Sequence, residues 1–353
     1  MKNKPKVLLY GTNCASVINS LTIGFEKINI PVKSLSFDFN RSLYNNYSKI
    51  KCICSDNHPG RVKQFFYKLK GFIILIRYLL WCDVVHIYGT KQKWHYWLIG
   101  KMAKNKFVTF VGSEIRMPEV ELAFNPFYKY AFYNEAYEYK HESHNQSDAL
   151  VRYLTKLKYG FIVWDTGTFI DRKITKKIGI VPHASVNNIQ NIFFRPENGR
   201  KVLIIHSPTA PVAKGTEFVL KAIEILEHKG IPFEFKLLTN LPNEEYQRIL
   251  LEADIYVDQL IWGGYGVAAQ QALQMGKVVV AYMNPEILKL FEGDLPVQNA
   301  TINNLAEVLE KLITNRELRE QISTQSLLFY ETTHEPGNVA KKMLATYQKL
   351  SEN

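Results

Sequence analysis

The amino-acid sequence predicts an α/β protein with two doubly wound parallel sheets. In the carboxy-terminal half, short β-branched runs alternate with segments of helical periodicity, and a less regular form of this alternation fills the amino-terminal half. Between the halves, residues 181–199 contain turn residues and no helical period, which is typical of a linker. Because parallel strands need crossover connections, each half predicts a sheet covered by helices.

In the carboxy-terminal half, each expected strand leads through a loop into a helix. We expect strands at 201–207, 233–239, 254–260 and 277–282, and helices at 216–230, 242–253 and 266–275. A short helical segment at 285–291 and one long helix at 302–322 come next. The last helix, at 338–350, follows the break THEPG.

The amino-terminal half shows strands that run into glycine-containing loops. These strands are expected at 6–11, 32–37, 83–89, 106–116 and 159–165. The sequence therefore predicts a first domain over residues 1–185 and a second over 196–335, facing each other across a cleft. A final helix at 336–353 is expected to cross back onto the first domain.

Length and composition are those of a globular protein with two domains. The chain has 353 residues, of which 46% are hydrophobic and 13% aromatic. Cys52 and Cys54 have no second cysteine pair or histidine cluster nearby, which argues against zinc and for thiols in a reducing compartment. The apolar stretch 71–82 is too short to cross a bilayer, and the amino terminus is too short of apolar residues for a signal peptide. We expect a cytoplasmic protein.

The positive charge is concentrated in the amino-terminal half. Of the net +11, residues 1–195 contribute +16 and the remainder −5. This asymmetry predicts an anionic partner, and an acidic membrane, an anionic ligand and nucleic acid all fit it. No nucleic-acid-binding motif is present.

A basic, aromatic-rich helix is expected over Arg61–Trp81. Lys63, Lys68 and Lys70 alternate there with aromatic side chains, a pattern that suits the headgroup region of an anionic membrane. The alternative is a core helix whose lysines extend outward to water. Both interpretations stay open on the sequence, and the charge of this half favours the membrane surface.

Three features at the ends of expected strands indicate an anion site in the second half. Thr209 and Lys214 follow one strand, and the turn Gly263–Gly266 follows another and precedes a helix. Ligands of parallel sheets bind at this edge, where helix amino termini carry partial positive charge. Alone, the glycines fit a plain turn and the lysine a solvated surface residue. Together they predict a diphosphate site, with Tyr265 as a wall or stacking face.

The segments HSPTAPVAKGT and ADIYVDQLIWGGYGVAAQQALQMGKVVVAY resemble the donor-binding segments of nucleotide-sugar glycosyltransferases of the GT-B fold, close to the retaining family 4 enzymes of bacterial surface polysaccharide synthesis. The amino-terminal DVVHIYG, FVTFVGSEIR and VPHASVNNIQNIFFRP are similar to further segments of that family, so the resemblance spans the chain. It implies two Rossmann-like domains, a nucleotide-diphosphate sugar as donor, and a glycan or lipid-linked acceptor.

The resemblance also implies roles for individual residues. Lys214 and Glu114 are the candidate catalytic residues, while Gly11, Thr12, Asn13, Ser113 and Arg116 are expected to bind the acceptor. The expected donor-binding residues are Thr209, Lys214, Gly264, Tyr265, Gly266, Val267 and Gln271. For Glu114 and Arg116, a local ion pair at a capped helix start fits equally well, and Thr12 and Asn13 also fit a simple turn.

Two family glutamates are missing from the glycine turn. Gly263 and Gln271 stand at their positions, and Pro211 replaces the arginine that often precedes the lysine. Gln271 retains hydrogen-bonding groups for a ribose, but Gly263 has no side chain that could position a sugar. No Asp-x-Asp sequence occurs, so we expect transfer without a metal or other cofactor.

The sequence therefore predicts glycosyl transfer with retention, in surface polysaccharide synthesis. The alternatives are a sugar-nucleotide epimerase or hydrolase of the same fold, and a catalytically weak partner protein that only binds nucleotide sugar. No nucleic-acid partner is expected, and the location could extend to the inner face of the cytoplasmic membrane.

Overall fold

The chain divides into two compact units. The computed structural model describes residues 4–36, 48–53, 60–89, 93–164, 169–186, 199–289, 291 and 295–352. Unit 1 consists of Met1–Met117, Glu142–Val186 and His334–Asn353, and unit 2 of Pro118–His141 and Asn187–Thr333. Each unit holds one parallel sheet with helices, which confirms the α/β class and the two sheets expected from the sequence.

Unit 1 contains a seven-stranded parallel sheet in the order β3-β2-β1-β4-β5-β6-β7. Its strands are β1 (Val7–Gly11), β2 (Val32–Ser36), β3 (Lys51–Cys52), β4 (Val84–Tyr88), β5 (Asn105–Thr109), β6 (Gly160–Val163) and β7 (Ile178–Ile180). Its helices are η1 (Cys14–Ser16), α1 (Val17–Lys27), α2 (Arg61–Trp81), α3 (Lys93–Met102), α6 (His144–Lys156) and α14 (Pro336–Glu352). The strand order changes direction between β1 and β4, so the topological switch point of this sheet lies there.

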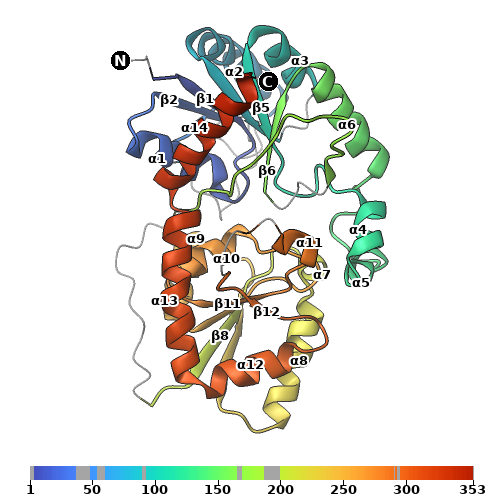
Figure 1. The fold of residues 1–353 in the computed structure, drawn as a ribbon, viewed down its shortest axis with the longest axis vertical. Helices are drawn as coiled ribbons and strands as arrows, with labels where there is room; N and C mark the ends of the chain where they lie inside the picture. Colours follow the sequence, from blue (N-terminus) through green and yellow to red (C-terminus); the bar gives the residue numbers. More distant parts are fainter. Residues whose placement is uncertain are drawn as a thin grey trace. The chain divides into compact units, whose positions relative to one another are not determined.

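Helix α14 brings the end of the chain back to unit 1, where it lies against α1 (Figure 1). A Cβ atom on Gly24 of α1 would lie 2.1 Å from the backbone oxygen of Pro336, so only glycine permits this approach. Lys27 and Glu335 form an ion pair at 2.8 Å beside this contact. Tyr347 of α14 stacks on Phe107 with ring centroids 4.6 Å apart.

Unit 2 contains a five-stranded parallel sheet in the order β12-β11-β10-β8-β9. Its strands are β8 (Val202–His206), β9 (Phe233–Leu237), β10 (Ile255–Val257), β11 (Val278–Ala281) and β12 (Gln298–Asn299). Its helices are α4 (Pro118–Phe124), α5 (Tyr128–Phe132), α7 (Pro211–Lys214), α8 (Thr216–His228), α9 (Asn243–Glu252), α10 (Val267–Gln274), α11 (Pro285–Leu288), α12 (Leu305–Thr314) and α13 (Arg316–Thr333). The switch point of this sheet lies between β8 and β10, which pair in register from Ile204↔Ile255 to His206↔Val257.

Two hydrophobic clusters cover the two faces of the second sheet. Ile204, Ile255 and Val257 belong to one cluster together with residues of α8 and α12. Leu203 and Tyr256 belong to the other, with residues of α9, α10 and α13. Neighbouring strand residues thus point to opposite faces and both faces are buried, which explains the continuous apolar runs in the sequence.

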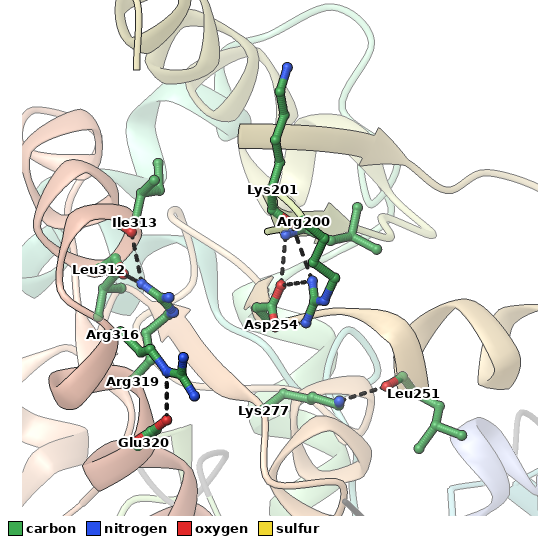
Figure 2. Close-up of polar contacts among 11 residues, drawn as sticks. Arg200, Lys201, Leu251, Asp254, Lys277, Leu312, Ile313, Arg316, Arg319 and Glu320 are labelled. Atoms are coloured by element: carbon green, nitrogen blue, oxygen red, sulfur yellow. Dashed lines mark hydrogen bonds and ion pairs between the residues drawn. The ribbon is translucent and has the colours of Figure 1, made fainter. Parts of the chain in front are cut away.

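At the amino ends of the strands, cations of unit 2 bind a carboxylate and helix carbonyls (Figure 2). The two terminal guanidinium nitrogens of Arg200 lie 2.6 Å from the carboxylate oxygens of Asp254, which also accepts a bond from the backbone N–H of Leu203. Lys277 donates to the Leu251 carbonyl at the end of α9 at 2.7 Å. These contacts compensate negative charge at strand starts and helix carboxyl termini, and therefore have a structural role.

The expected long helix at 302–322 is two helices, α12 and α13, with Asn315 between them. The Asn315 side chain accepts a bond from the backbone of Leu318 at 2.9 Å, which caps the start of α13. Arg319 donates to the carbonyls of Leu312 and Ile313, so the last turn of α12 has its own hydrogen-bond partner (Figure 2). The expectation of one helix was wrong because both parts are amphipathic and only these caps mark the break.

Residues 118–141 belong to unit 2, although the sequence placed them in the first domain. Tyr128, Ala131 and Tyr137 of this segment form a hydrophobic cluster with Ala213 of α7 and with Ile261. Two further boundaries are close to those expected, since unit 1 runs to Val186 and resumes at His334. Most of the expected linker, residues 187–198, lies outside the described residues.

Four buried histidines predict a loss of stability in mild acid. Burial lowers the pKa of His86 and His334 to about 3 and that of His95 and His206 to about 4. An unfolded histidine has a pKa of about 6.5, so below that pH the unfolded state binds more protons than the folded state. The free energy of unfolding should therefore fall as pH drops below about 6.5, by up to roughly 1.4 kcal/mol per histidine and pH unit. Denaturant titrations between neutral pH and about pH 5 measure this slope.

A pair of variants tests whether the buried histidines cause this pH dependence of the unfolding free energy. The imidazole of His86 bonds to Tyr347 and Thr109 at 2.8 Å each, whereas His228 is exposed. His86→Gln should reduce the slope of unfolding free energy against pH, and His228→Gln should leave it unchanged. Equal slopes for His86→Gln and the parent protein would contradict the assignment.

Candidate functional site

The residues expected to bind the donor follow β8 and β10, the two strands at the switch point of the second sheet. His206 ends β8, and the chain then passes through Thr209 to α7. Val257 ends β10, and the glycine turn follows it before α10 begins at Val267. Because β8 and β10 are hydrogen-bonded neighbours, their loops leave the same edge of the sheet side by side.

Lys214 forms a buried ion pair with Asp258. Its ammonium nitrogen lies 2.5 Å from Oδ1 of Asp258, and the two side chains are 11% and 0% exposed. The backbone N–H of Gly266 donates to the other oxygen of Asp258 at 2.6 Å. The cation and the amino terminus of α10 that the sequence assigned to a diphosphate therefore converge on one point, where the chain's own carboxylate lies.

The backbone of α7 is fixed to the loop after β10. The carbonyl oxygen of Lys214 accepts a hydrogen bond from the backbone N–H of Leu260 at 3.0 Å. Gly215 ends α7 in the left-handed conformation with φ 77°, which a glycine adopts without strain. Lys214 is thus held through its backbone and through its side chain.

His206 is a neutral side chain beneath this site. Its Nδ1 lies 2.8 Å from the Val257 carbonyl oxygen and its Nε2 lies 2.9 Å from Oγ1 of Thr216. A carbonyl only accepts, so Nδ1 carries the proton and the Thr216 hydroxyl donates to Nε2. Burial lowers the pKa of His206 to about 4, which keeps the ring uncharged at neutral pH.

Gly263 cannot carry a side chain in this structure. A Cβ atom there would lie 2.1 Å from Cβ of Asn284 and 2.9 Å from its backbone nitrogen. The backbone N–H of Asn284 donates to the Gly263 carbonyl at 2.9 Å, so the two segments are bonded at this contact. The absence of the first family glutamate is therefore part of the packing and not only a change of residue type.

Tyr265 lies in the hydrophobic core and does not present its ring as a stacking face. It is 3% exposed and belongs to the cluster behind the sheet. Its ring centroid lies 5.8 Å from that of Phe291 and 6.5 Å from that of Phe329. The sequence could not separate a core tyrosine from a binding one in a glycine turn.

The other expected donor-binding residues lie on the loop after β8, in the glycine turn and on α10. Thr209 is exposed on the loop after β8, and Val267 begins α10. The backbone oxygen of Gly264 accepts a bond from Gln259 at 2.7 Å. Gln271 on α10 accepts a bond from Gln247 of α9 at 3.1 Å, so an amide stands where the family places its second glutamate.

The segment Pro118–His141 contacts α7, the loop after β10 and the loop after β11. Both carboxylate oxygens of Glu138 accept bonds from backbone N–H groups at the start of α7, at 2.9 Å from Val212 and 3.1 Å from Ala213. Asn125 donates to the Ile261 carbonyl at 2.9 Å. The Asn284 side chain donates to the Phe124 carbonyl at 3.4 Å.

Gly11, Thr12 and Asn13, expected at the acceptor site, follow β1 in unit 1. A Cβ atom on Gly11 would lie 2.0 Å from the Tyr88 carbonyl oxygen, and the residue has φ 133°, so glycine is required. Thr12 is exposed, and its backbone N–H donates to the same carbonyl at 3.0 Å. Asn13 is fully buried, and its side-chain oxygen accepts bonds from the backbone of Ile18 and Asn19 in the first turn of α1. Asn13 therefore has a capping role.

Ser113, Glu114 and Arg116 lie in a turn after β5, not in a helix start. Glu114 accepts a bond from the backbone of Val111 at 3.0 Å. Its carboxylate lies next to Gly89 of the loop after β4, where an added Cβ would be 2.8 Å away. Arg116 is buried and paired with Glu142, so the local pair with Glu114 considered from the sequence is wrong. Ser113 is partly exposed, and a role for it at an acceptor stays a prediction.

Residues 212–327 match the sequence model of the family described as Glycosyl transferases group 1. The matched residues all lie in unit 2. The match begins in α7 and ends in α13, so it includes Lys214, Asp258 and the glycine turn. No curated protein sequence matches the chain.

Solved structures share the fold of the whole chain. Sucrose-phosphate synthase from Thermosynechococcus elongatus is 11% identical with a TM-score of 0.65, and 98% of this chain and 99% of that one are covered. HepE from Anabaena, in complex with UDP-glucose, is 10% identical with a TM-score of 0.60, with coverage of 97% and 99%. A putative UDP-N-acetylglucosamine 2-epimerase from Listeria monocytogenes is 14% identical with a TM-score of 0.52, with coverage of 97% and 95%. These likenesses show the GT-B fold, and the family match supports a glycosyltransferase.

Three residues of the candidate site in unit 2 were not singled out from the sequence. Asp258 directly follows a strand at the switch point, and this position in the sequence could have identified it as a site residue. Glu138 and Asn284 lie far from the glycine turn in sequence, and only the fold brings them to it. Their spacing in the sequence therefore does not predict that they contact the site.

The contact between Gly263 and Asn284 predicts that the family glutamate cannot be restored. Gly263→Ala and Gly263→Glu should both lower the free energy of unfolding, by about 1–3 kcal/mol or more, because the added atoms overlap Asn284. Gly266→Ala is the matched control, since a Cβ there meets its nearest atom at 3.4 Å and φ is −86°. Denaturant unfolding of the three variants measures the difference. A Gly263→Ala protein as stable as Gly266→Ala would contradict the close packing.

Proposed function

We propose that the chain transfers a sugar, with retention, from a nucleoside-diphosphate sugar to a glycan acceptor. The observation that carries the proposal is the position of the Lys214 ammonium at the amino terminus of α10, inside a domain of the glycosyltransferase family. An added Cβ on Gly266 would lie 3.7 Å from this ammonium. The cation and the helix amino terminus together provide the positive potential that a diphosphate requires.

In the proposed reaction, the bond between the anomeric carbon and the diphosphate oxygen breaks, and the acceptor hydroxyl attacks that carbon on the same face. The hydroxyl proton passes to the leaving diphosphate. Negative charge grows on the leaving diphosphate, and Lys214 and the N–H groups of the first turn of α10 stabilise that charge. Retention follows from the resemblance of this segment to retaining enzymes. Because a cation and N–H dipoles neutralise the leaving group, the proposed transfer needs no metal.

We infer further that the acceptor is lipid-linked and that unit 1 binds an anionic membrane surface, as in surface polysaccharide synthesis. Helices α2 and α3 support this, since they contain basic residues and no acidic one. Phe65 and Phe66 of α2 are 63% and 62% exposed, and Trp97 of α3 is 52% exposed. Phe72 of α2 contacts Trp94 of α3 with ring centroids 6.1 Å apart, which joins the two helices in one aromatic surface. Among the helices of the described residues, none is long and apolar enough to cross a membrane.

Two other functions remain outcomes of an activity test. An epimerase or hydrolase of the same fold would convert the nucleotide sugar without an acceptor. A partner protein with little catalytic power would bind nucleotide sugar without turnover, and the missing carboxylates at Gly263 and Gln271 are the observation that favours it. Product analysis of a panel of nucleotide sugars, with and without lipid-linked acceptors, distinguishes all three.

Lys214→Ala should lower the transfer rate by about 10²-fold or more, the cost of removing a charge-stabilising contact from a transition state. Lys221→Ala is the matched control, because this lysine lies on α8 in an exposed ion pair with Glu217. Initial rates and thermal unfolding of both variants are the measurements. Unchanged transfer in a folded Lys214→Ala protein would remove the phosphate role.

Transfer should persist after treatment with a metal chelator. The assay compares initial rates before and after dialysis against chelator, and again after Mg²⁺ or Mn²⁺ is added back. A strict requirement for a divalent metal would contradict the proposed mechanism.

Replacing Lys63, Lys68 and Lys70 by glutamate should release the protein from vesicles that contain phosphatidylglycerol. All three side chains are exposed on α2. Binding of the parent protein should weaken as salt rises, since exposed charges are screened beyond about 8 Å at physiological ionic strength. Vesicle sedimentation measures the binding, and transfer to a short soluble acceptor should be unaffected.

The control variant replaces Lys156, Lys173 and Lys176, which are exposed elsewhere on unit 1, by glutamate. It carries the same change in net charge and should still sediment with the vesicles. If both triple variants behave alike, α2 is not the membrane surface.

A further inference from the structure

Asp258 is a charged residue at the centre of the site to which neither the family resemblance nor the family match assigns a role. It directly follows β10, and its side chain is 0% exposed. An ionised carboxylate in such a position costs several kcal/mol unless it is paired and hydrogen-bonded. The ammonium of Lys214 at 2.5 Å and the backbone N–H of Gly266 at 2.6 Å provide both kinds of partner.

These two bonds place the lysine with respect to α10. An added Cβ on Gly266 would lie 3.4 Å from the Asp258 carboxylate and 3.7 Å from the Lys214 ammonium, so all three groups meet at the residue that caps the helix. The backbone of Lys214 is bonded to Leu260, two residues after Asp258. The carboxylate therefore determines where the end of this lysine side chain lies.

A fixed lysine has an advantage for binding an anion. A free lysine side chain loses up to about 2 kcal/mol of conformational entropy when a ligand immobilises it. An ammonium has three donors, and the bond to Asp258 uses one of them. The other two can bind phosphate oxygens while Asp258 keeps the side chain in place.

We propose that Asp258 is a positioning residue that holds the Lys214 ammonium at the amino terminus of α10 for the diphosphate of the donor. The inference rests on the proposed function, because it requires that Lys214 binds the diphosphate. Asp258 itself acts through Lys214 and does not contact the donor. The opposite role, in which the carboxylate competes with the diphosphate for Lys214, predicts an effect of opposite sign.

The test is a double-mutant cycle on nucleoside diphosphate binding. Calorimetry with UDP, GDP and ADP identifies the diphosphate that binds the parent protein, and its affinity is then measured for Asp258→Asn, Lys214→Met and the double variant. We expect each single variant to bind about tenfold or more weakly, the effect of losing a charge-assisted hydrogen bond. In the Lys214→Met background, Asp258→Asn should have no further effect, since its action passes through the lysine.

Asp254→Asn is the matched control. Asp254 immediately precedes the same strand, its side chain is 6% exposed, and it pairs with Arg200 at 2.6 Å (Figure 2). Loss of this ion pair should lower the melting temperature but leave diphosphate affinity unchanged. If Asp258→Asn does not fold, Asp258→Ser replaces it, because serine removes the charge and keeps a small polar side chain.

The outcomes separate this inference from the proposed function. Weaker binding by Asp258→Asn that vanishes in the Lys214→Met background supports the positioning role. Tighter binding, or weaker binding by Lys214→Met alone, overturns that role and leaves the proposed function standing. If Lys214→Met binds as the parent does, or if no diphosphate binds the parent, both are overturned.

Discussion

The ion pair between Lys214 and Asp258 joins three segments of unit 2: helix α7, the end of strand β10 and the first residue before α10. Helix α7 lies in the connection from β8 to β9, and the other two segments lie in the connection from β10 to β11. The pair therefore lies at the switch point between β8 and β10. A buried ion pair is weak evidence for stability, because desolvation offsets most of the attraction. Its value here is geometric, since it fixes a cation beside a helix amino terminus.

The glycine turn shows how packing restricts chemistry. Asn284 fills the space that a side chain at Gly263 would need, and a hydrogen bond between the two backbones keeps them in contact. The first carboxylate of the related enzymes therefore has no room in this chain. At the second position, Gln271 is engaged by Gln247, so an amide faces the place of a carboxylate. The negative charge in this part of the site belongs instead to Asp258, which forms an ion pair with Lys214.

The segment Pro118–His141 belongs to unit 2, although it lies between two parts of unit 1 in the sequence. It leaves unit 1 after β5 and returns to it before α6, and between these points it packs on α7 and the loop around Ile261. Glu138 accepts both bonds from the start of α7, and Asn125 holds the loop after β10. Through these contacts, a segment from the amino-terminal half of the chain helps to position the loops of the candidate site in unit 2.

The sequence by itself determined the fold class and most strands and helices, and it predicted the edge of the sheet where the candidate site lies. This was possible because alternating periodicity and glycine-containing strand ends are local properties, and parallel sheets place their ligands at one edge. The sequence also predicted that Lys214 binds a diphosphate, because it follows a strand at the edge where parallel sheets bind their ligands. Only the tertiary structure decided that Lys214 is paired with Asp258, that Tyr265 is a core residue, that Arg116 pairs with Glu142 and that residues 118–141 belong to unit 2. Those facts depend on contacts between residues far apart in the chain, and no local pattern of residue types encodes which of several plausible partners such a side chain meets.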